Sequence, residues 1–211
     1  MKLYTYFRSS AAYRVRIIAN LKGIAYEPEF VHLAKGKHND PAYKEVNPVG
    51  LVPCLIEDGQ LLTQSLAIIE YLEETHPEVP VLPGTPLERA RVRALSLLIA
   101  CEIHPLNNLR SLKYLTGVMK HTDEERDTWY RHWVEDGLSK LEAMLADGKT
   151  GKFCHGDTPG MADACLVPQV ANGMRFKSDF SRVPTVMRIY EECNKLDAFK
   201  KAAPPNQPDA E

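Results

Sequence analysis

The stretch Tyr6-Phe7-Arg8-Ser9-Ser10-Ala11-Ala12-Tyr13-Arg14-Val15-Arg16 decides the fold, because it joins a strand to a helix through a polar turn. Residues 2–7 are rich in aromatic side chains, as strands are, whereas Val15, Ile18 and Ala19 recur at helical spacing. Two serines lie at the joint. A helix N-terminus leaves backbone N–H groups unpaired and carries partial positive charge, so these hydroxyls either cap the helix or help to stabilise a bound anion.

The composition of the 211-residue chain limits its partners. Hydrophobic residues make up 44% and charged residues 26%, and the formal charge is −2, which matches a soluble globular protein. The length fits two modest domains, or one domain with an extension. Nucleic acid is not expected as a partner, because binding it needs a basic excess or stripe. We interpret the short arginine clusters as solvated helix faces or subunit contacts; they are Arg14/Arg16 and Arg89/Arg91/Arg93.

Neither a secretory leader nor a run near the roughly 18 apolar residues of a membrane span is visible, so we expect a cytoplasmic protein without a membrane partner. The cysteines are odd in number and lack the spacing of a disulfide framework or metal site, so we predict no metal and small buried thiols. They are Cys54, Cys101, Cys154, Cys165 and Cys193. None lies in the Ser9-Ser10 turn, so any thiol chemistry there needs a thiol from outside.

After the first helix, which should end near Gly23, residues 26–33 read as a second strand. A strand, a helix and another strand predict parallel pairing through a right-handed crossover. Residues 35–47 are polar and contain Pro41, which indicates a loop with a short helix.

Pro53 interrupts an apolar, strand-like run from Leu51 to Ile56. Proline removes a ladder donor and therefore belongs at a strand start or edge. A trans bond at a strand start and a cis bond in a tight turn both fit the spacing. The cis form would turn the backbone N–H and C=O of Val52 outward, where they could pair with an extended ligand.

Asp58-Gly59 is the signal of a tight hairpin, and residues 61–63 resume the strand. Gln64-Ser65 then precede apolar residues at helical spacing, so a second polar helix start follows the sheet. Two helix N-termini in one small sheet domain could hold two anionic groups of one ligand.

Prolines 77, 80, 83 and 86 end this helix and predict a linker. We therefore expect a sheet domain over residues 1–80, a linker over 81–88 and an all-helical domain over 89–211. Within that domain Pro105 should interrupt or kink a long helix between residues 87 and 115. Asp163 should cap its helix by accepting from Gly160.

Motif by motif, the chain resembles the cytosolic glutathione transferases. Their zeta class, the maleylacetoacetate isomerases, is matched by Ser9-Ser10 with Tyr13-Arg14-Val15-Arg16-Ile17, by residues 64–74, and by Val167-Pro168-Gln169-Val170-Ala171-Asn172 with Arg175-Phe176. The likeness extends from Lys2 through the terminal residues 203–209, so it covers essentially the whole chain.

The resemblance implies a thioredoxin-like α/β domain followed by an all-α domain, a homodimer, and glutathione as cofactor. It places Ser9 and Ser10 at the glutathione sulfur, Val52 before a cis Pro53, and Gln64-Ser65 at the γ-glutamyl end. Arg175 would face the carboxylate of an acidic substrate. The other implied contacts with glutathione are Ala11, His38, His104 and Asn108, and the other implied contacts with substrate are Arg8 and Arg110.

The implied reaction is conversion of maleylacetoacetate to fumarylacetoacetate in tyrosine and phenylalanine catabolism. Maleylpyruvate isomerisation, conjugation, dehalogenation of small α-halo acids and non-catalytic glutathione binding stay open. Three positions depart from the family pattern: Ala11 replaces a common cysteine, Leu51 replaces the glutamine of animal members, and Gly160 replaces a capping Thr or Ser. Because Gly at an N-cap costs only a few tenths of a kcal/mol, folding should tolerate Gly160.

Overall fold

The computed structural model describes all residues, Met1–Glu211, and divides into two compact units. The first unit contains Met1–Val81 together with Lys195–Glu211, and the second contains Leu82–Asn194. Residues 195–211 therefore belong with the N-terminal unit and not with the helical domain in which the sequence pattern placed them. None of the helices has the length and apolar character needed to span a bilayer.

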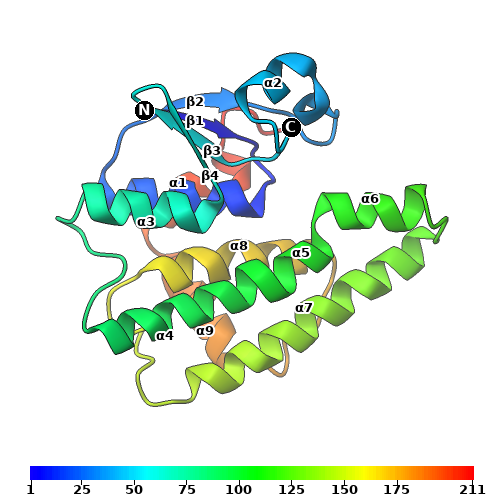
Figure 1. Ribbon diagram of the computed structural model, residues 1–211. Coiled ribbons are helices and arrows are strands. Elements are labelled where there is room, and N and C mark those ends of the chain that lie inside the picture. Colours follow the sequence, from blue (N-terminus) through cyan, green and yellow to red (C-terminus); the bar gives the residue numbers. More distant parts are fainter. The chain divides into compact units, whose positions relative to one another are not determined.

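A four-stranded mixed sheet forms the centre of the first unit (Figure 1). Its strands, in the order β2-β1-β3-β4, are β1 (Lys2–Thr5), β2 (Glu27–Phe30), β3 (Cys54–Glu57) and β4 (Gln60–Thr63). The first two strands are parallel, as predicted, and the last two form an antiparallel hairpin. The hairpin turn has positive φ at Asp58 and Gly59, which explains the Asp-Gly pair.

The longer helices of the first unit pack beside the sheet. Helix α1 (Ser10–Lys22) ends at Gly23, whose left-handed backbone closes the last turn as expected. It packs against α3 (Ser65–Thr75) and α10 (Asp197–Ala202) (Figure 1). Shorter elements complete the unit: η1 (Lys37–Asn39), α2 (Pro41–Val46) and η3 (Pro204–Asn206).

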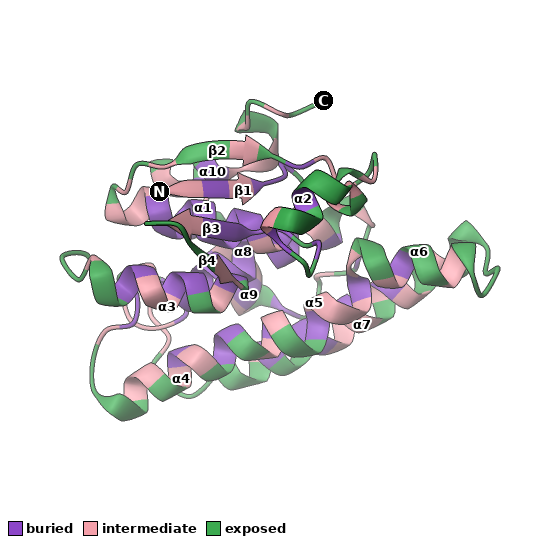
Figure 2. Ribbon diagram, turned by 45° about the horizontal axis from the view of Figure 1, so that its top comes forward, coloured by how far each residue is buried: buried purple, intermediate pink, exposed green.

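Two arginines lie inside the first unit. Most residues of α1 are buried (Figure 2). Arg14 and Arg16 are only 2% and 1% exposed, so the prediction of a solvated arginine face is wrong for this pair. Arg14 donates to the Ser65 hydroxyl, and Arg16 donates to backbone carbonyls and a hydroxyl. Because buried charges are costly unless they are hydrogen-bonded, these contacts explain why arginine is tolerated there.

The second unit is helical, as predicted, with one isolated bridge between Thr150 and Gly156. Its elements are α4 (Pro86–Leu97), the π-helical turn η2 (Leu98–Ile103), α5 (His104–Asn107), α6 (Leu109–Gly117), α7 (Asp123–Leu145), α8 (Met161–Arg175) and α9 (Pro184–Cys193). Gly137 lets α7 approach η2 closely, because a Cβ there would lie 2.3 Å from a side-chain carbon of Ile103.

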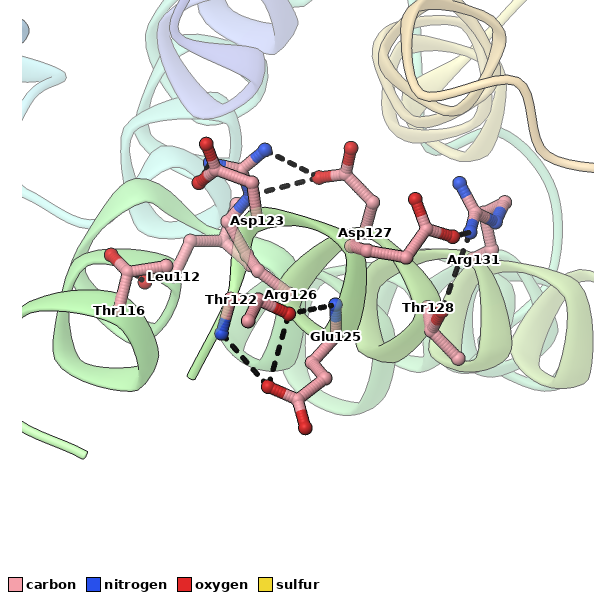
Figure 3. A network of polar contacts seen from close by, with 10 residues as sticks. Leu112, Thr116, Thr122, Asp123, Glu125, Arg126, Asp127, Thr128 and Arg131 are labelled. Atoms are coloured by element: carbon pink, nitrogen blue, oxygen red, sulfur yellow. Dashed lines mark hydrogen bonds and ion pairs between the residues drawn. The ribbon is translucent and has the colours of Figure 1, made fainter. Parts of the chain in front are cut away.

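Helix α7 begins with a reciprocal cap (Figure 3). The Thr122 hydroxyl accepts from the Glu125 N–H at 3.2 Å, and the Glu125 carboxylate accepts from the Thr122 N–H at 2.8 Å. Arg126 then bridges Asp123 and Asp127 on the first turns. The cap satisfies backbone donors that the helix itself leaves unpaired.

The expected interruption at Pro105 is displaced in the structure. The helix continues through the π-helical turn into α5, and the backbone breaks only at Asn108, where it becomes extended. The wider π turn gives the proline ring room against the preceding carbonyls. Asn108 then starts α6 by accepting from the Ser111 N–H at 3.1 Å.

The Asp163 cap is confirmed, whereas one cysteine prediction is wrong. Asp163 accepts from the N–H groups of Gly160 and Cys154, both at 2.8 Å. Four of the five free cysteines are buried as predicted, but Cys101 is exposed on the π-helical turn.

Candidate functional site

Strand register brings three segments of the first unit to one edge of the sheet. Strands β1 and β3 pair Tyr4 with Cys54, and β3 and β4 pair Cys54 with Thr63. The end of β1, the start of β3 and the end of β4 therefore lie side by side. These positions lead directly into the Ser9 turn, the Val52–Pro53 segment and the Gln64–Ser65 helix start.

Ser9 is the N-cap of α1. Its hydroxyl oxygen accepts from the Ala12 N–H at 3.2 Å, while its own N–H donates to the Tyr6 carbonyl at 2.9 Å. A hydroxyl has one proton as well as its acceptor lone pairs, so the Ser9 O–H is still able to donate to an anion. The capping and anion-binding interpretations of Ser9 are therefore compatible.

The neighbouring residues of the turn differ in exposure. Ser10 begins α1 and is buried, Ala11 follows it in the first turn, and Arg8 is exposed. The Arg8 guanidinium lies 4.9 Å from the centre of the Phe7 ring. The first turn of α1 contains no acidic residue, so no carboxylate on it competes for its positive end.

The Val52–Pro53 peptide bond is cis, which resolves the alternative that the sequence left open. The preceding Leu51 carbonyl accepts from the Tyr43 hydroxyl at 2.6 Å and from the Asn47 amide at 2.8 Å. In contrast, neither the backbone N–H nor the C=O of Val52 forms a hydrogen bond within the chain. Since buried backbone groups are nearly always paired, this backbone pair is a candidate ligand contact.

His38 belongs to the same neighbourhood. It lies in η1, and its backbone oxygen would be 3.0 Å from a Cβ placed on Gly50. The η1 turn therefore lies against the loop that leads to Val52. Gly50 adopts a φ of +64°, which together with this close approach explains the glycine.

Gln64 and Ser65 form the N-terminus of α3. Gln64 has a positive φ of 69°, and its exposed side chain makes no cap hydrogen bond. A non-glycine residue held at positive φ is uncommon and is often found at ligand sites. The buried Ser65 hydroxyl accepts from the Arg14 guanidinium at 3.2 Å, which ties the two helix starts together.

Cys54 follows Pro53 directly, but its environment opposes ionisation. Burial raises the pKa of the Cys54 thiol above its ordinary value, although hydrogen bonds from Tyr43 and Asn47 partly offset the rise. Thiolate reactivity requires a lowered pKa. The cysteine nearest this edge is thus unsuited to act as the nucleophile.

The second unit holds Arg175 at the end of α8. The guanidinium lies 5.2 Å from the centre of the Phe176 ring and donates to the Asn172 side chain at 3.0 Å. Phe176 in turn stacks on Tyr130, with ring centres 3.8 Å apart. Burial raises the pKa of Tyr130, and the nearby charge of Arg175 opposes that rise.

The other predicted residues of the second unit lie around the α5–α6 junction. His104 begins α5, Asn108 caps α6, and the exposed Arg110 lies in the first turn of α6. Asn108 is engaged as a helix cap through its side-chain oxygen. Its amide nitrogen is the part of the side chain that remains for a ligand.

The residues that hold the site segments in place were not predicted from the sequence. Tyr43 and Asn47 anchor the loop before Val52, and Arg14 links α1 to α3. Asp209 contacts the turn before Ser9. Asn47, followed by Pro48 and then by Gly50, was a usable loop signal, whereas nothing local pointed to Asp209. No group of three or more His, Cys, Asp or Glu side chains is arranged to hold a metal ion.

The first unit matches a known family model. Residues 3–80 match the model described as "Glutathione S-transferase, N-terminal domain". The mixed sheet with α1 and α3, followed by a helical unit, is the architecture expected of that class. The match and the fold together indicate the class of glutathione transferases.

The relatives narrow the class further. The chain is 49% identical to a probable maleylacetoacetate isomerase of Vibrio cholerae, over 99% of this chain and 97% of that protein. A holo structure of maleylpyruvate isomerase, described as a bacterial zeta-class glutathione transferase, is 44% identical over both full chains with a TM-score of 0.98. Maleylacetoacetate isomerase of Methylobacterium extorquens, solved with malonate and glutathione, is 44% identical over both full chains with a TM-score of 0.96. The chain belongs to the zeta-class glutathione transferases, the family of these isomerases.

The N-cap geometry separates the two serines by their effect on stability. Ser9→Ala should lower the free energy of unfolding by about 1 kcal/mol, because it removes the acceptor for the Ala12 N–H. Ser10→Ala should change it by less than about 0.5 kcal/mol, because Ser10 is the first residue of the helix and does not accept the capping bond. Urea unfolding of both variants measures the difference. Equal losses in the two variants would contradict this assignment of the cap.

Proposed function

We propose that this protein is a glutathione-dependent cis–trans isomerase that converts maleylacetoacetate to fumarylacetoacetate. The observation that supports it most is the gathering of three features at one sheet edge. They are the capping hydroxyl of Ser9, the unpaired backbone of Val52 and the exposed amide of Gln64.

These features fit glutathione, which is an extended peptide with a thiol and anionic ends. The N–H and C=O of Val52 can pair with its backbone as an added strand does. The α3 N-terminus, with Gln64 and Ser65, suits the γ-glutamyl carboxylate, because helix N-termini bind anions. The amides of Ser10 and Ala11 at the α1 N-terminus suit the sulfur in the same way. We include His38, His104 and Asn108 as further contacts.

Bound glutathione supplies a thiolate that adds to the conjugated C=C bond and leaves again after rotation about the resulting single bond. A free thiol has a pKa of about 8.5, so only a few per cent is ionised at neutral pH. Making the anion the majority species takes a shift of about two units, or roughly 2.7 kcal/mol. A hydroxyl donor at a helix N-terminus can supply a shift of that order, and Ser9 is the residue placed to do so.

Arg175 is proposed to bind a substrate carboxylate and to stabilise the negative charge that develops on the substrate during addition. Its guanidinium is restrained by Asn172 and by the Phe176 ring, which limits the side-chain entropy lost on binding. The malonate of the Methylobacterium relative is a dicarboxylate, which supports an acidic substrate. Arg8 and Arg110 are exposed and are proposed as secondary carboxylate contacts.

Maleylpyruvate is the alternative substrate, because a relative of that name shares the whole fold. Dehalogenation of small α-halo acids and conjugation would use the same thiolate. Non-catalytic glutathione binding is disfavoured by the Ser9-Ser10 turn occurring together with Gln64-Ser65. We further propose a cytoplasmic homodimer, as is typical of this family.

The experiment that tests the proposal follows the glutathione-dependent absorbance change with maleylacetoacetate and maleylpyruvate side by side. We expect turnover of maleylacetoacetate only when glutathione is present, with higher kcat/KM than for maleylpyruvate. A higher kcat/KM for maleylpyruvate would instead identify the protein as a maleylpyruvate isomerase. Retention on a glutathione matrix without turnover of either substrate would indicate a binding protein.

Replacing Arg175 tests the substrate contact. Arg175→Ala should raise KM for maleylacetoacetate by about 10- to 100-fold, because charge-assisted hydrogen bonds are worth roughly 1.5–3 kcal/mol, and should leave KM for glutathione nearly unchanged. For Arg175→Lys, KM for maleylacetoacetate should lie between the values for wild type and Arg175→Ala, since lysine keeps the charge but lacks the planar guanidinium. Arg182→Ala, at an exposed arginine of the same unit, is the matched control. Equal changes in both KM values would remove the proposed role.

A further inference from the structure

The terminal segment after α10 lies on the first unit beside the turn that precedes Ser9. An Asp209 carboxylate oxygen accepts from the backbone N–H of Phe7 at 3.0 Å. Two residues later, Glu211 pairs with Lys35 and with His32, whose ring packs against Tyr6. A segment at one end of the sequence thereby contacts the turn at the other end.

Arg16 holds the same turn from inside the unit. Its guanidinium donates to the carbonyls of Tyr6 at 3.2 Å and Phe7 at 3.1 Å, and to the Thr5 hydroxyl at 2.9 Å. Its Nε donates to the Ala202 carbonyl at 3.1 Å, which ties α10 to the same group. The amide and carbonyl of Phe7 are therefore both bound by charged side chains.

The two charges also act on each other. Burial lowers the pKa of Arg16 to about 10, and interactions with Tyr26, Tyr13 and, least of the three, Asp209 oppose that fall. With a pKa of about 10, the guanidinium stays charged at neutral pH. Arg16 and Asp209 thus both hydrogen-bond to the backbone of residues 5–7, which lead to Ser9.

We infer that Asp209 is a positioning residue for catalysis, because its bond to Phe7 fixes the turn that aims the Ser9 hydroxyl at the thiol of bound glutathione. Asp209 acts through Phe7 and makes no contact with substrate. The inference rests on the proposed function, since it assigns a task to the Ser9 hydroxyl of that site.

Without the Asp209 carboxylate, the turn would lose its hydrogen bond at the Phe7 N–H. Phe7 is buried, so removal of the carboxylate leaves its backbone N–H without this partner. Ser9 donates its own N–H to Tyr6, so movement at residues 6 and 7 is passed directly to the N-cap. A displaced Ser9 hydroxyl would form a weaker hydrogen bond with the sulfur of bound glutathione, because hydrogen bonds weaken steeply as their geometry departs from the ideal distance and angle.

Asp209→Ala tests the inference through the thiol. We expect the pKa of bound glutathione to rise by about one unit and kcat to fall about tenfold at neutral pH, with KM for maleylacetoacetate within about twofold of wild type. In ligand-free protein, amide hydrogen exchange at Phe7 should accelerate by about tenfold or more. Ultraviolet titration, steady-state kinetics and exchange measured by NMR provide the three readouts.

Asp209→Asn is the conservative variant, because its amide oxygen can still accept from the Phe7 N–H. It should retain most of the thiol pKa shift and most of kcat. If the alanine variant does not fold, the thiol pKa and kcat of Asp209→Asn test the positioning role in its place. Asp197→Ala is the matched control, since Asp197 is an exposed aspartate in α10 that pairs with Lys200. The control should leave the thiol pKa and the Phe7 exchange rate unchanged.

The outcomes separate this inference from the proposed function. If wild-type protein fails to ionise bound glutathione, the proposed function is wrong and the positioning role falls with it. If wild type ionises it and Asp209→Ala does so equally well, only the positioning role is overturned. A loss of unfolding free energy in Asp209→Ala with an unchanged thiol pKa would likewise mean that Asp209 serves folding alone.

Discussion

The buried guanidinium of Arg16 is the interaction on which the first unit depends. It reaches Thr5, Tyr6 and Phe7 at the end of β1 and Ala202 at the end of α10. A guanidinium has five donors in a fixed planar arrangement, so it can join several carbonyls that would otherwise be buried without partners. One side chain of α1 thereby fixes the strand, the turn and the terminal helix. The Ser9 cap is positioned by this arrangement.

The pairing of β1, β3 and β4 brings the Ser9 turn next to the other segments of the candidate site. Because β3 runs antiparallel to both of its neighbours, the segments before and after these strands meet at a single edge of the sheet. Two helix N-termini and one unpaired backbone segment then face the same region. A ligand with two anionic groups and an extended backbone matches that set. The fold therefore determines the class of ligand before any side chain adds specificity.

Local patterns predicted much of this structure, and long-range contacts explain what they missed. The strand–turn–helix from Tyr6 to Arg16 and the Asp-Gly hairpin were predictable, because turn and cap preferences act over a few residues. The burial of Arg16 was not predictable, because its main-chain partners include Ala202, which is remote in sequence. The same holds for Asp209 and Phe7. The break at Asn108 was displaced from Pro105 because a π-helical turn accommodates the proline.

The proposed reaction requires that the Ser9 turn holds the thiol of glutathione as its anion. Ultraviolet titration of the bound thiol in wild type, Ser9→Ala and Ser10→Ala measures this directly. We expect most of the thiol to be ionised at neutral pH in wild type. Ser9→Ala should raise the pKa of the bound thiol by about one unit or more, and Ser10→Ala should have the smaller effect. An unshifted thiol in wild-type protein, or identical titrations of wild type and Ser9→Ala, would contradict it.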